Sequence, residues 1–223
     1  MAYGESDVIA TYLTATTGKI SMLVRGGRAS KKRVQGALEP FHTARVRFVE
    51  RRDLATFKDA ELVVVRTGIT AHLDALEAAG QALRWARDLC PPRTPEPAAF
   101  ATLSELLDAL DAKRTESAVP PSVHLVAAGL RLLRDVGYGL DLDACVRCGK
   151  PCPEGRSAHV SGRAGGIVCA TCGGEGRLVA ASALAMARDV LRSGTIAPLS
   201  PPDLRALVAV VEDALLAHAD IGD

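Results

Sequence analysis

The N-terminal third of the chain carries short runs that are rich in β-branched residues. They span residues 8–13, 19–25, 44–50 and 62–67. In the second and third runs apolar and polar positions alternate with a period of two, which is typical of half-buried strands. Glycines in the intervening segments, such as Gly18, Gly26 and Gly27, indicate turns. Four short strands in this space predict a small β-barrel that ends near residue 72.

Beyond residue 72 the apolar positions recur at three- and four-residue spacing, which predicts helices. The residues expected on the buried face of the first helix are Leu73, Leu76, Leu83 and Cys90. The pair Pro91-Pro92 must stop this helix, because proline has no backbone N–H to donate. A second helix is expected to begin near Thr102, which forms a capping-box pattern with Glu105.

Three more helices are predicted in the C-terminal half. Residues 115–122 have the composition of a loop, and the helix after it ends at Gly137. Its apolar face consists of Leu125, Val126, Leu130, Leu132, Leu133 and Val136. The next helix spans 182–193, with Ser182 as N-cap and Gly194 as its stop. The last spans 203–218 and buries Leu204, Leu207, Val208, Val211 and Leu215. The apolar faces of these helices indicate core packing rather than a cofactor site.

Length and composition favour a folded protein. The chain has 223 residues, of which 48% are hydrophobic and 24% charged, enough for one large or two small domains. No apolar run approaches the roughly 18 residues that a membrane span needs. The N-terminus, with Glu5 and Asp7, lacks the regions of a secretory signal. We therefore expect a cytoplasmic protein with no membrane partner.

The most specific chemical signal is a pair of CxxC motifs, Cys145 with Cys148 and Cys169 with Cys172. Each motif turns tightly enough to place two thiolates on one side of a metal, and two motifs supply the tetrahedral set that Zn²⁺ prefers. Glycines follow both motifs, and the segment between them has almost no apolar core of its own. The spacing predicts one structural Zn²⁺ per chain, which contributes on the order of 10–16 kcal/mol in small sites.

Other readings of the cysteines remain open at this stage. Two unrelated CxxC pairs, redox-active or merely buried, would give the same pattern, although no βαβ pattern of a thioredoxin-like fold is visible. A catalytic zinc is disfavoured, because four cysteine ligands leave no position for water or substrate. Cys152 could compete as a ligand and is interpreted as a spectator thiol, and Cys90 as a core residue.

Basic residues concentrate near the N-terminus although the net charge is only +1. Residues 19–52 hold ten Lys or Arg against two acidic residues. Such a segment attracts phosphates without reading sequence. The candidate nucleic-acid-binding residues are Lys19, Arg25, Arg28, Lys31, Lys32, Arg33, Arg45 and Arg47, with Arg51 and Arg52 as extensions if the strands 19–25 and 44–50 lie side by side. The alternative is an ordinary solvated loop.

Several stretches together resemble the RecO family. They are Gly4-Glu5-Ser6-Asp7, Thr17-Gly18-Lys19-Ile20, the segment 25–33, Gly36-Ala37-Leu38-Glu39-Pro40-Phe41, and Leu132-Leu133-Arg134-Asp135-Val136-Gly137-Tyr138 leading into Cys145-Val146-Arg147-Cys148-Gly149. The resemblance spans nearly the whole chain. It implies an α+β protein with an N-terminal OB-fold β-barrel at 1–72, followed by a helical domain at 73–223. A four-cysteine zinc ribbon is inserted in that domain at about 143–176. Family members usually have one more strand before residue 4, so the barrel is expected to lack its first strand.

The resemblance also implies a function. RecO-like proteins are DNA repair and recombination mediators of the nucleoid. They bind single- and double-stranded DNA, anneal complementary strands and act with RecR to load RecA on strands coated by single-strand binding protein (SSB), whose C-terminal tail is a further partner. An alternative is an adaptor that docks SSB or RecR with only incidental DNA contact. We expect no enzymatic activity, because a His-x-Glu element beside the cysteines, a Walker loop and an open metal position are all lacking.

Overall fold

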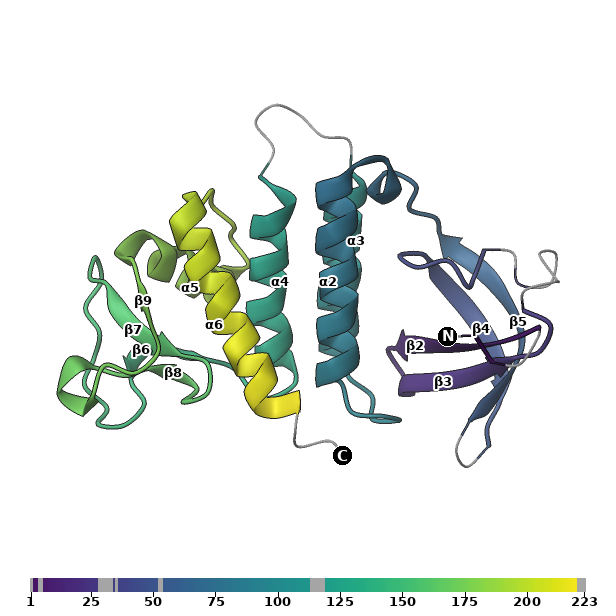
Figure 1. The fold of residues 1–223 in the computed structure, drawn as a ribbon, viewed down its shortest axis with the longest axis horizontal. Coiled ribbons are helices and arrows are strands. Elements are labelled where there is room, and N and C mark those ends of the chain that lie inside the picture. The colour runs from purple at the N-terminus through teal and green to yellow at the C-terminus, as the bar shows by residue number, and fades with distance from the viewer. Residues whose placement is uncertain are drawn as a thin grey trace.

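The computed structural model describes residues 2–3, 6–27, 34, 36–51, 54–112 and 119–219. Its elements follow the chain as a five-stranded sheet, a set of helices and a second, four-stranded sheet. The two sheets lie at opposite ends of the molecule with the helices between them (Figure 1). The α+β class predicted from the sequence is confirmed at this level.

The first sheet consists of β1 (Ala2–Tyr3), β2 (Asp7–Thr14), β3 (Gly18–Val24), β4 (Thr43–Val49) and β5 (Ala55–Val64). Three of the four predicted strands are confirmed with their ends shifted by one residue. The fourth was placed wrongly, because the strand begins at Ala55 and not at residue 62. Its first half alternates between buried and more exposed positions, but Lys58 and Asp59 break up the apolar run that the sequence reasoning looked for.

The strand order is β1-β2-β3-β5-β4, and all pairings are antiparallel except that of β3 with β5. Because β5 lies between β3 and β4, the condition that residues 19–25 and 44–50 lie side by side is not met. In the described part of the chain neither β1 nor β2 pairs with β4, so the sheet is open where a barrel would close. The two residues of β1 pair with Asp7 and Val8. Whether the barrel lacks a strand before residue 4 stays a prediction.

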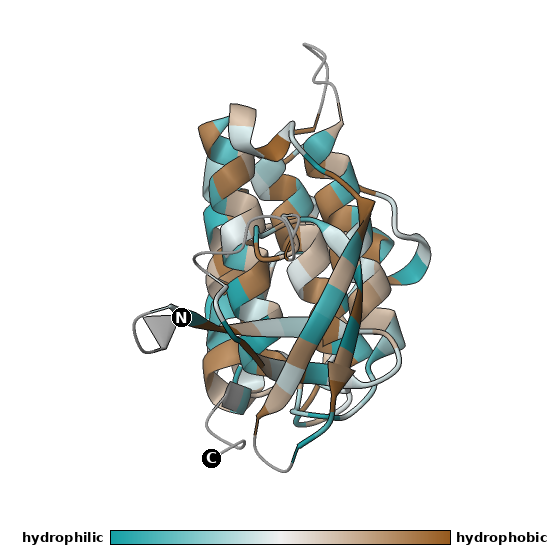
Figure 2. Cartoon of the chain, turned by 90° about the vertical axis from the view of Figure 1, so that its right-hand side faces the viewer, coloured by the Kyte–Doolittle hydropathy of each residue, from teal (hydrophilic) through white to brown (hydrophobic). Residues whose placement is uncertain are grey.

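A small core lies on one face of this sheet. Ile20, Met22 and Val24 alternate along β3 and are almost fully buried, together with Ala55 and Phe57 of β5. The alternation of hydrophilic and hydrophobic residues along the strands is visible in Figure 2. Burial of these side chains fixes the register of β3, because a slip by one residue would expose Ile20, Met22 and Val24 together.

The helices are α2 (Leu73–Leu89), α3 (Pro97–Asp111), α4 (Pro121–Asp135), α5 (Ala181–Ser193) and α6 (Pro201–Ala219), with a short 3-10 turn η1 (Ile69–Ala71) before α2. The predicted face of α2 is wrong in its first half, because Leu73 and Leu76 are 70% and 37% exposed. Alanines and Trp85 form its buried face instead. Close packing between α2 and α4 explains why this face is the buried one, since a Cβ at Gly129 of α4 would lie 2.7 Å from the Trp85 ring.

The predicted capping box of α3 is also wrong. The helix begins at Pro97, and Thr102 is 1% exposed inside it. The Thr102 hydroxyl donates to Asp135 Oδ2 at 2.6 Å, so this residue joins α3 to α4 instead of capping a helix.

The remaining helices lie close to their predicted positions. Helix α4 starts at Pro121, inside the predicted loop, and residues 115–118 of that loop lie outside the described residues. Helix α5 ends as predicted at Gly194, which has a positive φ of 75°. Its predicted N-cap is wrong, because Ser182 Oγ instead donates to Asp203 Oδ2 of α6 at 3.1 Å.

Arg66 joins the first sheet to the helices. Its side chain is 2% exposed and its Nε donates to Asp108 Oδ1 of α3 at 2.7 Å. The same guanidinium donates to the Phe41 carbonyl at 2.8 Å and to Thr43 Oγ1 at 2.9 Å. Charge-assisted hydrogen bonds of this kind are about twice as strong as neutral ones. Arg66 therefore holds the segment before β4 and helix α3 in one arrangement.

A second contact joins the α2–α3 connection to the β2–β3 turn. The Arg93 amide donates to the Lys19 carbonyl at 2.9 Å, next to an isolated bridge between Lys19 and Pro92. Gly18 has a φ of 74°, and a Cβ there would lie 2.0 Å from the Thr94 carbonyl oxygen. Only glycine permits both this backbone conformation and this close approach.

Candidate functional site

The second sheet carries the cysteines. It consists of β6 (Asp141–Cys145), β7 (Ala158–Ser161), β8 (Gly166–Ile167) and β9 (Arg177–Val179) in the order β6-β8-β7-β9, with a 3-10 turn η2 (Ala170–Cys172) before β9. Cys145 ends β6 and Cys172 ends η2. Each CxxC motif folds back on itself, because the Gly149 amide donates to the Cys145 carbonyl at 2.8 Å and the Gly174 amide to the Cys169 carbonyl at 3.1 Å.

The four predicted ligands come together in space. The sulfur atoms of Cys145, Cys148, Cys169 and Cys172 all lie within 4.8 Å of one another, and those of Cys148 and Cys169 are 3.7 Å apart. Tetrahedral zinc with Zn–S distances of about 2.3 Å requires sulfurs about 3.8 Å apart. All six cysteines are free thiols, and Cys152 is not part of the group that the described residues form. The donor set and its spacing fit a metal ion of the zinc type.

The electrostatics of the four thiols also favour a bound cation. The Cys169 amide donates to Cys145 Sγ at 3.4 Å, and hydrogen bonds of this kind lower the pKa of Cys145 to about 6. The neighbouring side chains of Cys148 and Cys169 raise the pKa of Cys172 to about 12. Four thiolates this close repel one another, and a divalent ion at their centre supplies the charge that lets all four ionise. No open position is left for a substrate.

Helices α5 and α6 hold the cysteine-bearing sheet. Arg188 of α5 is 5% exposed and donates through Nε to the Leu142 carbonyl at 2.9 Å. Arg192, one turn later, pairs with Asp143 at 2.8 Å. On the other side, a Cβ at Gly162 would lie 2.3 Å from the Ala214 nitrogen of α6. The cysteine-bearing sheet is therefore packed directly on α5 and α6.

The candidate nucleic-acid-binding residues that the structure describes differ in the partners they contact. Arg45 pairs with Glu61 at 3.3 Å and Arg47 with Asp59 at 2.7 Å, both across β4 and β5. The hydrogen bond from Arg47 also lowers the pKa of Asp59. Lys19 Nζ donates to the Arg87 carbonyl near the end of α2.

Of the rest of the predicted basic patch, the structure describes only some residues. Arg25 is exposed at the end of β3, and Arg51 follows β4 and is exposed as well. Outside the described residues lie Arg28, Lys31, Lys32, Arg33 and Arg52. The central basic segment thus stays a prediction.

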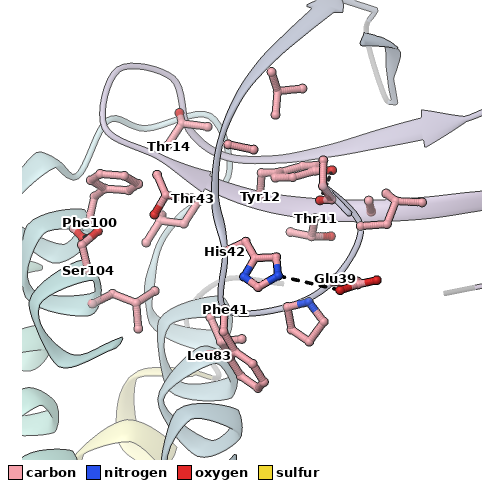
Figure 3. A pocket seen from close by; sticks show the side chains of 18 of the residues that line it. Thr11, Tyr12, Thr14, Glu39, Phe41, His42, Thr43, Leu83, Phe100 and Ser104 are labelled. Carbon is pink, nitrogen blue, oxygen red and sulfur yellow. Dashed lines mark hydrogen bonds and ion pairs between the residues drawn. The ribbon is translucent and has the colours of Figure 1, made fainter. Parts of the chain in front are cut away.

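A cleft of about 530 Å³ opens between β2, the chain at 37–48 and helix α3. Figure 3 shows Tyr12, His42 and Ser104 on its different walls. Tyr12 donates to the Ala37 carbonyl at 3.0 Å, and burial raises the pKa of its phenol to about 12. His42 Nδ1 accepts the Arg66 amide at 3.2 Å, and Nε2 lies 3.7 Å from Glu39. Sequence reasoning missed this cleft, because three segments far apart in sequence form it.

Comparisons with known proteins agree with this architecture. The family described as Recombination protein O N terminal matches residues 1–66, and Recombination protein O C terminal matches residues 71–222. A protein of Anaeromyxobacter sp. (strain K), named DNA repair protein RecO, is 39% identical over 96% of this chain and 87% of its own length. Proteins of the same name from Geobacter metallireducens and Myxococcus xanthus are 32% and 36% identical, over 98% and 97% of this chain and 88% and 86% of their own. The chain belongs to the RecO family.

Proposed function

We propose that this protein acts in DNA repair and recombination as a mediator without catalytic activity of its own. It binds single- and double-stranded DNA and anneals complementary strands. The observation that carries the proposal is the match of both RecO domains along the chain, with relatives named DNA repair protein RecO over nearly its full length. The closed set of four thiols supports a structural metal rather than a catalytic one.

The first sheet supports an OB-type DNA-binding domain in this proposal. Its order β1-β2-β3-β5-β4 with one parallel pair, β3 with β5, is the order of a five-stranded Greek-key barrel of that class. Such barrels are often only partly closed, which agrees with the open seam between β2 and β4. They present charged loops and grooves to single strands.

The basic segment after β3 is the proposed DNA contact. Arg28, Lys31, Lys32 and Arg33 bring four positive charges to one connection. Arg45 and Arg47 contribute less, because each already pairs with a carboxylate of β5. Cationic side chains here reduce the repulsion between phosphates of two strands, and base pairing then supplies the free energy of annealing.

A groove in the C-terminal half supports the second part of the proposal, which is binding to protein partners. These partners are SSB and RecR, and through them RecA. The groove lies between β9 and α6. Arg177 and Arg205 line it beside the apolar side chains of Leu178 and Val210, and Asp213 is the single acidic residue of the lining. Two cations next to an apolar surface suit a peptide that carries both carboxylates and a hydrophobic residue, such as the proposed SSB tail. If this groove is the main site, the protein is an adaptor with incidental DNA contact.

Fluorescence anisotropy across a salt titration tests the proposal. Replacing Arg28, Lys31, Lys32 and Arg33 together by alanine should weaken binding to a labelled single-stranded oligonucleotide for every sequence. It should also reduce the slope of log K against log salt by about 3, since each phosphate contact contributes about 0.7. The matched control is Arg45→Ala with Arg47→Ala, which should change the slope by less than about 1.

The same assay separates the two candidates. Unchanged binding in the fourfold variant would refute the placement of the DNA site. Weak binding of the unaltered protein, together with tight binding of an acidic peptide that Arg177→Ala and Arg205→Ala abolish, would favour the adaptor.

A further inference from the structure

The groove between α6 and β9 has two walls that are held in place differently. Helix α6 is part of the main core, in which Leu207 and Val211 are 2% and 0% exposed. Strand β9 (Arg177–Val179) has only three residues, and in the described part of the chain it pairs with β7 alone. Its last residue, Val179, is buried, whereas Leu178 is 62% exposed. The residues of β9 that line the groove therefore have little packing of their own to hold them.

The start of β9 is tied to the cysteine site by a short connection. Cys172 ends η2, and four residues, Gly-Gly-Glu-Gly at 173–176, separate it from Arg177. All three glycines have a positive φ, and glycine loses more conformational freedom on folding than any other residue. Gly176 also passes close to β7, because a Cβ there would lie 2.2 Å from the Val160 carbonyl oxygen. The connection therefore needs a fixed point at Cys172 to bring Arg177 to one position.

Arg147 connects the other CxxC motif to the same segment. It lies between Cys145 and Cys148 in the chain. Its Nη1 donates to the Cys172 carbonyl at 3.0 Å, and its Nη2 donates to Glu175. These bonds form only while the two motifs lie side by side, and four thiolates stay that close only around a cation. The metal site therefore fixes the segment at Cys172 directly and at Glu175 through Arg147.

The charge of the groove depends on Arg177. The groove has a volume of about 810 Å³, and its charged residues are Arg177, Arg205 and Asp213. With Arg177 in place the lining carries two positive charges and one negative charge, which gives a net charge of +1. Without it, the charges of Arg205 and Asp213 cancel. The attraction for a peptide carboxylate therefore depends on where β9 places Arg177.

We propose that the four-cysteine site positions Arg177 for a partner peptide that carries carboxylates and an apolar residue, so that metal binding and peptide binding are coupled. With the metal bound, both walls of the groove are in place. Without it, α6 keeps its position, but Arg177 and Leu178 are no longer held against it. The inference rests on the peptide groove proposed above and not on DNA binding, because the first sheet lies at the opposite end of the molecule (Figure 1).

Fluorescence anisotropy on the full chain measures this coupling. The probe is a labelled eight-residue peptide that contains three aspartates and ends in a leucine. In a buffer with a non-thiol reductant, we expect saturable binding to the zinc-loaded protein and at least about tenfold weaker binding after a chelator has removed the zinc. Adding zinc back should restore the affinity. Binding of a single-stranded oligonucleotide to the same samples should not change, because the proposed DNA contact follows β3 and not β9.

Reciprocity gives a second measurement on the same protein. Two coupled sites change each other's affinity by the same factor. A saturating amount of the peptide should therefore raise the zinc affinity by at least about tenfold, as measured by competition with a chromophoric chelator. General weakening of a damaged fold does not predict this equality.

Two variants locate the coupling. Arg177→Ala keeps the four thiols but removes the side chain that they position, so the peptide should bind at least about tenfold more weakly and no longer change the zinc affinity. Arg156→Ala is the matched control, because it removes an exposed arginine between the two CxxC motifs that does not line the groove. This variant should keep the peptide affinity and its dependence on zinc.

Four results overturn the inference. Equal peptide affinity with and without zinc would refute the coupling but leave the groove as a peptide site. Zinc-dependent binding that Arg177→Ala does not weaken would place the peptide elsewhere, and displacement of the peptide by an oligonucleotide would assign the groove to nucleic acid. No saturable binding to the zinc-loaded protein up to about 1 mM would refute the peptide groove as well, whereas failure of the mediator function would show as absent DNA binding.

Discussion

Single residues set some of the tightest constraints in this protein, and most of them are small. Gly129 lies under the Trp85 ring, and Gly162 lies against α6. The four cysteines could be selected from the sequence because their spacing is specific to one chemistry. The glycines and the alanine face of α2 could not, because close approach depends on which helix lies opposite.

Gly18 gives the sharpest prediction for a single residue. Gly18→Ala should destabilise the protein by more than about 2 kcal/mol, because the new Cβ meets the Thr94 carbonyl and the residue keeps a positive φ. Gly26 is the matched control, with a φ of 62° and no atom within 4 Å of a built Cβ. Gly26→Ala should cost only about 1–2 kcal/mol, the cost of the left-handed conformation. Urea denaturation measures both, and equal losses would contradict the clash.

At the scale of elements, the sheet that carries the four cysteines is small. Strands β8 and β9 have two and three residues, too few for an independent sheet. The four-cysteine group was predictable from its two CxxC motifs, whereas the contacts of its sheet with Arg188 and Arg192 were not. Strand β5 was harder to place, because its apolar residues are separated by lysine and aspartate. Its burial depends on the β-strands that flank it.

Loss of one cysteine should remove the metal and unfold the ribbon alone. We expect one zinc per chain in the unaltered protein and less in Cys148→Ser, with fast hydrogen exchange at residues 141–179 and the helices still protected. Cys152→Ser is the control, since Cys152 lies outside the four-thiol group and should keep a full complement of zinc. Zinc is measured by atomic emission. A Cys152→Ser protein without zinc would show that the ligand set is different.

At the scale of the whole molecule, a buried arginine connects the first sheet to the helices. Arg66 bonds the Phe41 carbonyl and Asp108 from a position with 2% exposure. The sequence predicts a sheet followed by helices, and the structure agrees, but how the two parts pack together was not predictable. A basic residue near the end of a predicted strand carries no sign that it will be buried, because its partners are more than twenty residues away in both directions.

Arg66→Ala should cost about 2–3 kcal/mol in the free energy of unfolding, because it removes charge-assisted hydrogen bonds and leaves the Phe41 carbonyl without its donor. Arg45→Ala removes an exposed pair, with both side chains 74% exposed, and should cost less than about 1 kcal/mol. Chemical denaturation followed by Trp85 fluorescence reports on the helices in both variants. Equal effects of the two substitutions would mean that the Arg66 contacts contribute no more than a surface pair.

The contact between Lys19 and the α2–α3 connection has a consequence for how the chain can be divided. Gly18 and Lys19 belong to the first sheet, whereas Pro92, Arg93 and Thr94 come after the first long helix. A cut after residue 72 therefore separates the β2–β3 turn of the first sheet from the backbone at residues 92–94 that it contacts. The smallest piece that retains these contacts with Pro92, Arg93 and Thr94 extends to residue 94 and includes all of α2. Cooperative unfolding and protease resistance of the sheet should accordingly depend on a helix that sequence comparison assigns to the other half.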